Sequence, residues 1–138
     1  MAETLSLEQM NYLVDLGFRA SDASMIQMEL DQTDASMSFL GRNALIKKTD
    51  YSRSLVDGGL AFYVYTLQNV LDKLPRVIRV EDDEYTLRLY PISGNLWGVA
   101  YIEPQEEREN TLKVFSSSLL DAAYKMLCWA RTNGYMEP

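Results

Sequence analysis

Residues 117–138 constrain the fold more than any other part of the chain, because they predict an amphipathic helix that needs a large surface to pack on. Ser117 or Ser118 can cap this helix, whose predicted range is 118–133, and Gly134 can end it. The apolar stripe of the helix comprises Leu119, Leu120, Ala123, Tyr124, Met126, Leu127, Trp129 and Ala130. A stripe of this width is typical of a helix that is packed on a sheet and not solvated on most of its sides.

Two further helices are predicted by the residues at their ends. A capping-box pattern, SLEQ, begins at Ser6; apolar residues then repeat at helical spacing over 7–16, and Gly17 suits the left-handed position after the helix. A short helix is predicted over 67–74, with the preceding threonine as its cap. Pro75 ends it, because the residue before a proline resists the α conformation.

Several segments rich in alternating, branched or aromatic residues predict β-structure. The predicted strands are 24–30, 60–65, 85–90, 96–102 and 112–115. Residues 31–59 are expected to form an insertion with one or two strands and mobile connections. This order of elements predicts an α+β fold, with a single antiparallel sheet of about five to six strands and helices packed on one face.

Size and composition predict one globular domain over residues 1–138. A chain of 138 residues buries roughly two-thirds of its unfolded surface, which is enough for a core without a metal or a disulfide. The hydrophobic fraction of 47% and the charged fraction of 24% are ordinary for such a domain.

The charge balance disfavours two classes of partner. Twenty acidic residues against thirteen basic ones give a net charge of −7, whereas nucleic acids and anionic membrane surfaces attract clustered cations. No apolar run approaches the roughly 18 residues of a spanning helix, and the N-terminal residues MAETLSLEQ lack the features of a signal peptide. With a single cysteine, the chain is expected to be cytoplasmic.

The absence of histidine excludes several kinds of catalysis. Triads that depend on a histidine base are impossible, and a zinc site is improbable with one cysteine and no histidine. The sequence also lacks the glycine-rich motifs that bind nucleotides, so we expect a protein that is not an enzyme and has no cofactor. A divalent-cation-dependent enzyme built on carboxylates stays open as an alternative, although no pattern positions its catalytic groups.

Two features that resemble reactive or metal sites have simpler interpretations. Cys128 lies inside the predicted closing helix, and without a histidine to activate its thiol we expect it to be a packing residue. Residues 81–84, Glu-Asp-Asp-Glu, could hold a hard cation, but no glycine-punctuated calcium loop surrounds them. We expect them to form a solvated turn.

A basic segment is the sharpest local departure from the acidic composition. It comprises Arg42, Asn43, Lys47, Lys48, Tyr51 and Arg53. One interpretation is an anion site, where cations and an aromatic ring hold the phosphate and base of a nucleotide. The other is a set of exposed side chains that balance acidic residues elsewhere in the fold.

Aromatic side chains recur on one face of a predicted strand. Trp97 and Tyr101 share that face with Val99. Stripes of this kind are usually core, but they can also line a groove on a sheet face that no helix covers.

About half of the chain resembles a family of small proteins encoded by phages and mobile elements of gut bacteria. The resemblance lies in the order of YTLQNVLDKLP, then LWGVAY, then LLDAAYKMLCWARTNGY, over residues 66–135. The segment 31–59 departs from the family pattern. The group has no established activity, so the resemblance carries over no functional residue. It implies a phage or mobile-element origin and a small accessory role, for which counter-defence is one possibility.

These observations predict a binding protein that contacts a host protein or an anionic small molecule, possesses no nucleic-acid or membrane partner, and forms a homo-oligomer. Its contact surface is expected to be either exposed aromatic residues or the basic segment. The alternatives are sequestration of a nucleotide-like anion and the cation-dependent enzyme.

Overall fold

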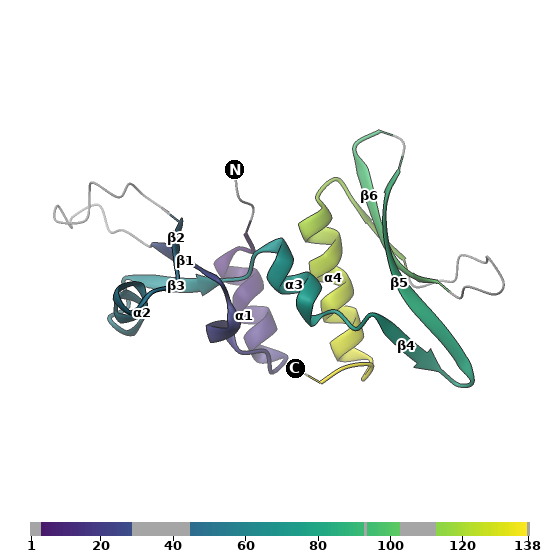
Figure 1. Cartoon of the computed structure of the whole chain (residues 1–138), viewed down its shortest axis with the longest axis horizontal. Coiled ribbons are helices and arrows are strands. Elements are labelled where there is room, and N and C mark those ends of the chain that lie inside the picture. Colours follow the sequence, from purple (N-terminus) through teal and green to yellow (C-terminus); the bar gives the residue numbers. More distant parts are fainter. Residues whose placement is uncertain (1–3, 29–44, 93, 103–112, 138) are drawn as a thin grey trace. The chain divides into compact units, whose positions relative to one another are not determined.

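The computed structural model describes residues 4–28, 45–92, 94–102 and 113–137, and Figure 1 shows the arrangement of their helices and strands. The chain divides into two compact units, Met1–Asn69 and Val70–Pro138. The expectation of one domain, which rests on chain length, stays a prediction. No helix within the described residues is long and apolar enough to cross a membrane.

The α+β class is confirmed, but the prediction of a single sheet is wrong. The described strands form two antiparallel sheets, one with the order β2-β1-β3 and one with the order β4-β5-β6-β7. The strands of each sheet come from the same half of the chain. Pairing within a half closes shorter loops than pairing across the chain, and therefore loses less conformational entropy.

The first unit begins with α1, Leu7–Asp15, whose start the sequence predicted. The Ser6 hydroxyl accepts a hydrogen bond from the Gln9 backbone amide at 3.1 Å, and the Gln9 side chain accepts one from the Ser6 amide at 2.9 Å. Gly17 follows the helix with a φ of 101°, a left-handed conformation that glycine adopts without steric cost.

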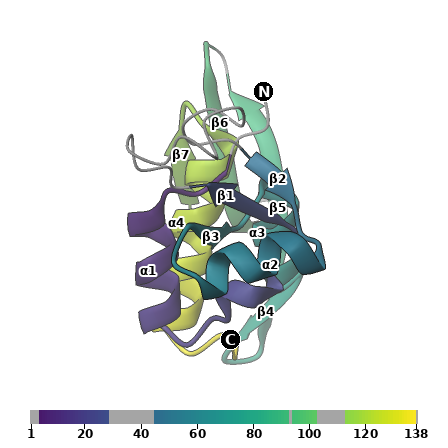
Figure 2. The ribbon, with the colours of Figure 1, turned by 90° about the vertical axis from the view of Figure 1, so that its left-hand side faces the viewer.

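The three-stranded sheet of this unit has a covered face. Its strands are β1 (Met25–Met28), β2 (Leu45–Lys47) and β3 (Ala61–Val64). Ile26 and Met28 are fully buried, and they pack with Leu55 of α2 (Asp50–Asp57). Figure 2 shows α2 in front of β1 and β3.

Helix α2 was not predicted from the sequence, because its cap is an unusual one. The Thr49 hydroxyl accepts a hydrogen bond from the Ser52 amide at 3.1 Å, and the Ser52 hydroxyl accepts one from the Thr49 amide at 2.7 Å. A serine thus occupies the place that glutamate or glutamine takes in the usual capping box. Residues 45–59 therefore contain one of the expected strands and a helix in place of a mobile connection.

Helix α3, Leu67–Lys73, has the ends that the sequence predicted. The Thr66 hydroxyl accepts a hydrogen bond from the Asn69 amide at 3.2 Å, and the Asn69 side chain accepts one from the Thr66 amide at 2.9 Å. The helix ends two residues before Pro75.

The second unit contains a four-stranded antiparallel sheet with the closing helix on one face (Figure 1). Its strands are β4 (Val77–Val80), β5 (Asp83–Ile92), β6 (Leu96–Ile102) and β7 (Lys113–Ser116), and α4 spans Leu119–Thr132. The predicted strands 85–90 and 96–102 lie in β5 and β6, which pair as a hairpin, and β4 is an additional strand that the sequence did not reveal. Ser118 caps α4 by accepting a hydrogen bond from the Asp121 amide at 3.2 Å, and Gly134, with a φ of 78°, follows the helix.

The face of this sheet toward α4 forms the core of the unit. Val99 and Tyr101 on β6 are fully buried, and the Tyr101 ring lies 6.4 Å from the Trp129 ring of α4. The Tyr101 hydroxyl donates a hydrogen bond to the Pro75 carbonyl at 2.7 Å. Burial of the ring raises the pKa of Tyr101, so the hydroxyl keeps its proton and remains a donor.

Candidate functional site

The structure places the described members of the basic segment on different parts of the first unit. Lys47 is exposed at the end of β2, where it pairs with Met25 of β1. The neighbouring residue on each strand, Ile46 and Ile26, belongs to the cluster packed with α2. Because side chains alternate along a strand, Lys47 lies on the face of the sheet away from α2.

Tyr51 and Arg53 stand on α2 itself, on either side of the buried Ser52. Both are exposed, and the exposed fraction of Tyr51 is 62%. Residues two apart on a helix are separated by about 200° around its axis. The structure therefore does not bring the Tyr51 ring and the Arg53 guanidinium together.

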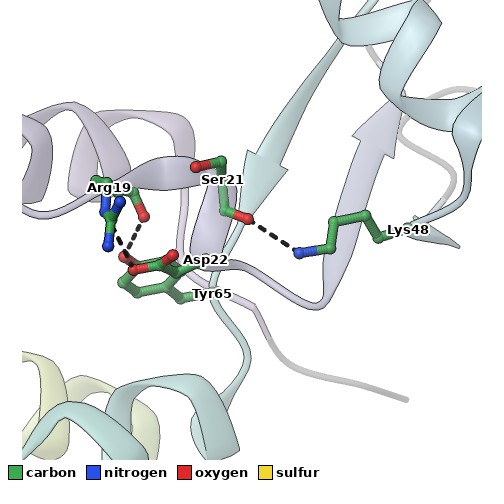
Figure 3. Close-up of polar contacts among 5 residues, drawn as sticks. All are labelled: Arg19, Ser21, Asp22, Lys48 and Tyr65. Atoms are coloured by element: carbon green, nitrogen blue, oxygen red, sulfur yellow. Dashed lines mark hydrogen bonds and ion pairs between the residues drawn. The ribbon is translucent and has the colours of Figure 1, made fainter.

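Lys48 contributes to local structure. Its ammonium donates a hydrogen bond to the Ser21 carbonyl at 2.9 Å (Figure 3). Ser21 is the middle residue of η1, a short 3₁₀ helix at Ala20–Asp22, and it lies 27 residues before Lys48 in the sequence. The lysine thus fastens the residues after β2 to the connection that precedes β1.

The same short helix is held from a second side by Tyr65. The Tyr65 hydroxyl donates a hydrogen bond to the Arg19 carbonyl at 2.5 Å, next to the weak ion pair between Arg19 and Asp22 at 4.0 Å (Figure 3). Burial of the ring, together with the Asp22 carboxylate, raises the pKa of Tyr65 to about 12. The hydroxyl is therefore a protonated donor throughout the physiological range.

Arg42 and Asn43 lie outside the described residues, so the predicted anion site is described only by Lys47, Lys48, Tyr51 and Arg53. Of these, Lys48 is engaged with a backbone carbonyl, and the other three lie on separate surfaces. The ligand-binding role of the segment stays a prediction.

Cys128 and residues 81–84 lie in environments that suit a packing residue and a solvated turn. Burial raises the pKa of the Cys128 thiol, so the thiol is protonated at neutral pH and a poor nucleophile. Residues 81–84 are all exposed around the β4–β5 turn, where Glu81 has a φ of 58°. In the part of the chain that the structure describes, no three acidic or cysteine side chains are grouped so that they could hold a metal ion.

A second candidate surface, which the sequence did not reveal, is the face of the four-stranded sheet opposite α4. We call it the outer face. Its apolar members include Val77, Leu96 and Phe115, which are 42%, 44% and 51% exposed. These exposed fractions show that no described element covers them. Large exposed apolar patches on a folded chain are typical of contact surfaces.

Strand register arranges the outer face in rows. One row contains Tyr90, Gly98 and Phe115, which are paired directly across β5, β6 and β7. The next row toward the hairpin turn contains Ile92 and Leu96. We call Tyr90, Ile92, Leu96 and Phe115 the hairpin patch. The row on its other side contains Arg88, Ala100 and Lys113, so two cations border the patch.

Gly98 leaves room on β6 for the aromatic ring of Tyr90. A Cβ atom added to Gly98 would come within 2.6 Å of Cζ and 2.7 Å of Cε2 of Tyr90. The ring therefore occupies the space of the missing side chain, an arrangement known to protect glycine in strands. This packing buries Gly98 and extends an apolar surface from β5 over β6.

The Tyr90 hydroxyl is buried and has no hydrogen-bond partner among the described residues. A buried donor without a partner costs about 1–3 kcal/mol, and native structures contain few of them.

The predicted aromatic stripe of β6 belongs mainly to the core. Tyr101 and Val99 are buried beneath α4, whereas Trp97, on the same face, is 37% exposed near the end of the strand. No sequence signal grouped Tyr90 with Phe115, because their positions are 25 residues apart and meet only through the register of three strands.

Comparison of the chain with protein-family models, curated proteins and solved structures found no match.

Proposed function

We propose that this chain is a non-enzymatic binding protein that contacts a host protein through the hairpin patch. The observation that carries the proposal is the exposure of Leu96 and Phe115 beside the ring of Tyr90 and the guanidinium of Arg88. Protein contact surfaces are enriched in aromatic and arginine side chains, and a few such residues supply most of the binding energy.

The resemblance of residues 66–135 to phage and mobile-element proteins suggests where the protein acts. A binding protein of that origin works in the cytoplasm of its bacterial host, where counter-defence, by occupying a host protein, is a function that needs no catalysis. This part of the proposal rests on the resemblance alone.

Affinity capture with matched variants tests the proposal. The tagged chain is incubated with a lysate of bacteria that carry its gene, as wild type, as Leu96→Ser/Phe115→Ser, and as two controls, Tyr12→Ser and Tyr51→Ser. Both control tyrosines are exposed, at 48% and 62%, but lie on α1 and α2. A host protein captured by the wild type is then purified and its direct binding measured.

The expected result is a host protein that binds the wild type and both controls but binds the double variant at least tenfold more weakly. If Tyr51→Ser abolishes binding and the double variant retains it, the basic segment is the contact surface and the proposal is wrong. Equal binding by all four proteins also contradicts it.

A further inference from the structure

We infer that the outer edge of β4 pairs with β4 of a second copy of the chain, so that two four-stranded sheets join into one. β4 is the first strand in the order β4-β5-β6-β7, and among the described strands it pairs only with β5. A strand at the edge of a sheet offers a row of N–H and C=O groups to which another chain can bond. This surface is separate from the hairpin patch, and the inference goes beyond the proposed function.

The hydrogen bonds between β4 and β5 determine which residues present their backbone groups at this edge. The Leu87 N–H donates a hydrogen bond to the Arg76 carbonyl at 2.8 Å. Because the direction of the N–H and C=O groups alternates along a strand, Ile78 also bonds toward β5. The N–H and C=O groups of Val77 and Arg79 therefore point away from β5.

A proline closes the rest of this edge. Beyond Leu87, β5 continues without β4 beside it, and the backbones of Leu89 and Pro91 have the same orientation as that of Leu87. Pro91 has no N–H to donate, and a proline at such a position hinders the addition of a strand. Residues 76–80 contain no proline, so β4 is the better place for strand addition.

The charges around β4 favour a second copy as the added strand. Arg76 immediately precedes β4, Glu81 and Asp82 form the turn after it, and Asp83 begins β5. All four side chains are exposed, and none of them forms an ion pair within the described part of the chain. β4 thus has a cation at one end and carboxylates at the other, so an antiparallel second copy brings opposite charges together at both ends.

One register uses all the backbone groups at the edge. When Val77 of each copy lies opposite Arg79 of the other, the outward N–H and C=O groups of both strands pair, and a twofold axis passes between the two Ile78 residues. The faces that carry α4 then lie on the same side of the joined sheet. The two Arg79 side chains are not opposite each other, and each has its own exposed ion pair with Glu84 at 3.8 Å.

The opposite charges also meet in this register. Arg76 lies opposite Val80 of the second copy, and the neighbour of that valine on β5 is Asp83. The Cα atoms of this arginine and this aspartate are then two strand spacings apart, about 10 Å, a gap that the two side chains together can span. The twofold axis forms the same pair a second time.

Charge-swap variants of the full chain test the inference by analytical ultracentrifugation over a wide range of concentrations at physiological ionic strength. One variant is Arg76→Glu, and the other is Asp82→Lys/Asp83→Lys. The wild type is expected to dimerise, and each variant alone to dimerise at least tenfold more weakly. An equimolar mixture of the two variants should regain the wild-type affinity, because the carboxylate introduced in one then faces the lysines introduced in the other.

Three further variants locate the contact. Arg79→Pro removes an outward N–H and should abolish dimerisation, whereas Leu96→Ser/Phe115→Ser, in the hairpin patch, should leave it unchanged. Arg53→Glu makes the same change in net charge as Arg76→Glu but lies on α2, and it should dimerise like the wild type. Circular dichroism verifies that each variant is folded.

Several results overturn the inference. One is a wild type that stays monomeric at the highest concentration, and another is a mixture of the charge variants that dimerises no more tightly than either alone. Loss of the dimer in Leu96→Ser/Phe115→Ser assigns the contact to the hairpin patch instead. Oligomers larger than a dimer also contradict the inference, because a twofold contact is closed.

Discussion

The basic segment and the hairpin patch are built in opposite ways. Lys47, Tyr51 and Arg53 lie within seven residues of each other in the sequence, yet a strand face and a helix direct their side chains to different surfaces. Tyr90 and Phe115 are 25 residues apart, yet strand register sets them in one row. Closeness in the sequence therefore wrongly suggests that the residues of the basic segment form one surface. The hairpin patch, in contrast, becomes visible only once the strand pairing is known.

The two surfaces also differ in what their side chains do within the fold. Lys48 holds the Ser21 carbonyl and so stabilises the first unit. Phe115 is 51% exposed, so about half of its surface stays in water. An apolar side chain that is left largely in water is the better candidate for a binding residue.

The largest expected effect separates the two faces of the four-stranded sheet. Tyr101→Ala should lower the free energy of unfolding by about 3–5 kcal/mol, because it empties a buried position under α4. Phe115→Ala, on the outer face, should lower it by only about 1 kcal/mol, because about half of the side chain is already in water. Urea denaturation followed by tryptophan fluorescence reports on the second unit, since both tryptophans, Trp97 and Trp129, lie in it. A Phe115 variant as unstable as the Tyr101 variant would show that the outer face is core.

The packing of Tyr90 over Gly98 predicts the second-largest change in the free energy of unfolding. Gly98→Ala should cost about 1–3 kcal/mol, because the new Cβ atom displaces the Tyr90 ring. In a Tyr90→Ala background the same substitution should cost less than about 0.5 kcal/mol, and the difference is the coupling energy of the pair. Equal costs in both backgrounds would mean that the ring does not occupy this position.

Tyr65 makes the stability of the first unit depend on alkaline pH. The pKa of Tyr65 is raised to about 12 in the folded chain from an ordinary value of 10.0. A raised pKa means that the folded state holds the proton more tightly, so its contribution is fully present below pH 10 and is lost as the pH rises toward 12. Circular dichroism of the wild type should show this loss, and Tyr65→Phe should reduce it. An identical pH dependence in the variant would contradict the assignment.

The smallest effect distinguishes the two adjacent lysines. Lys48→Met should cost about 0.5–1 kcal/mol through loss of its hydrogen bond to Ser21, discounted for its partial exposure. Lys47→Met, at an exposed position, should be close to neutral. Thermal unfolding of the two variants measures the contrast, and an equal or reversed order would remove the structural role of Lys48.

Elements marked by local signals were predictable from the sequence. The caps at Ser6 and Ser118 and the left-handed glycines Gly17 and Gly134 gave α1 and α4, because these signals act within a few residues. Helix α2 was not predicted, because Ser52 takes the place of an acidic or amide residue in its capping box. The division into two sheets was not predicted either. Strand pairing depends on which segments meet, and the alternation of side chains along a strand does not specify its partner strand.

The candidate surface was less predictable than the fold. The exposed aromatics were expected to form a contact surface, but the stripe containing Tyr101 is core, and the residues that gather on the outer face come from three strands. The glycine at position 98 gave no sign in the sequence that a tyrosine ring lies over it. Only the register Tyr90–Gly98–Phe115 shows this arrangement.

Site-specific photo-crosslinking tests the central claim most directly. A photoreactive phenylalanine analogue replaces Phe115 in one variant and Tyr51 in another, and both are irradiated in the cells where the gene is expressed. The account predicts a covalent adduct with one host protein from position 115 and none from position 51. Adducts only from position 51, or the same adducts from both positions, would contradict it.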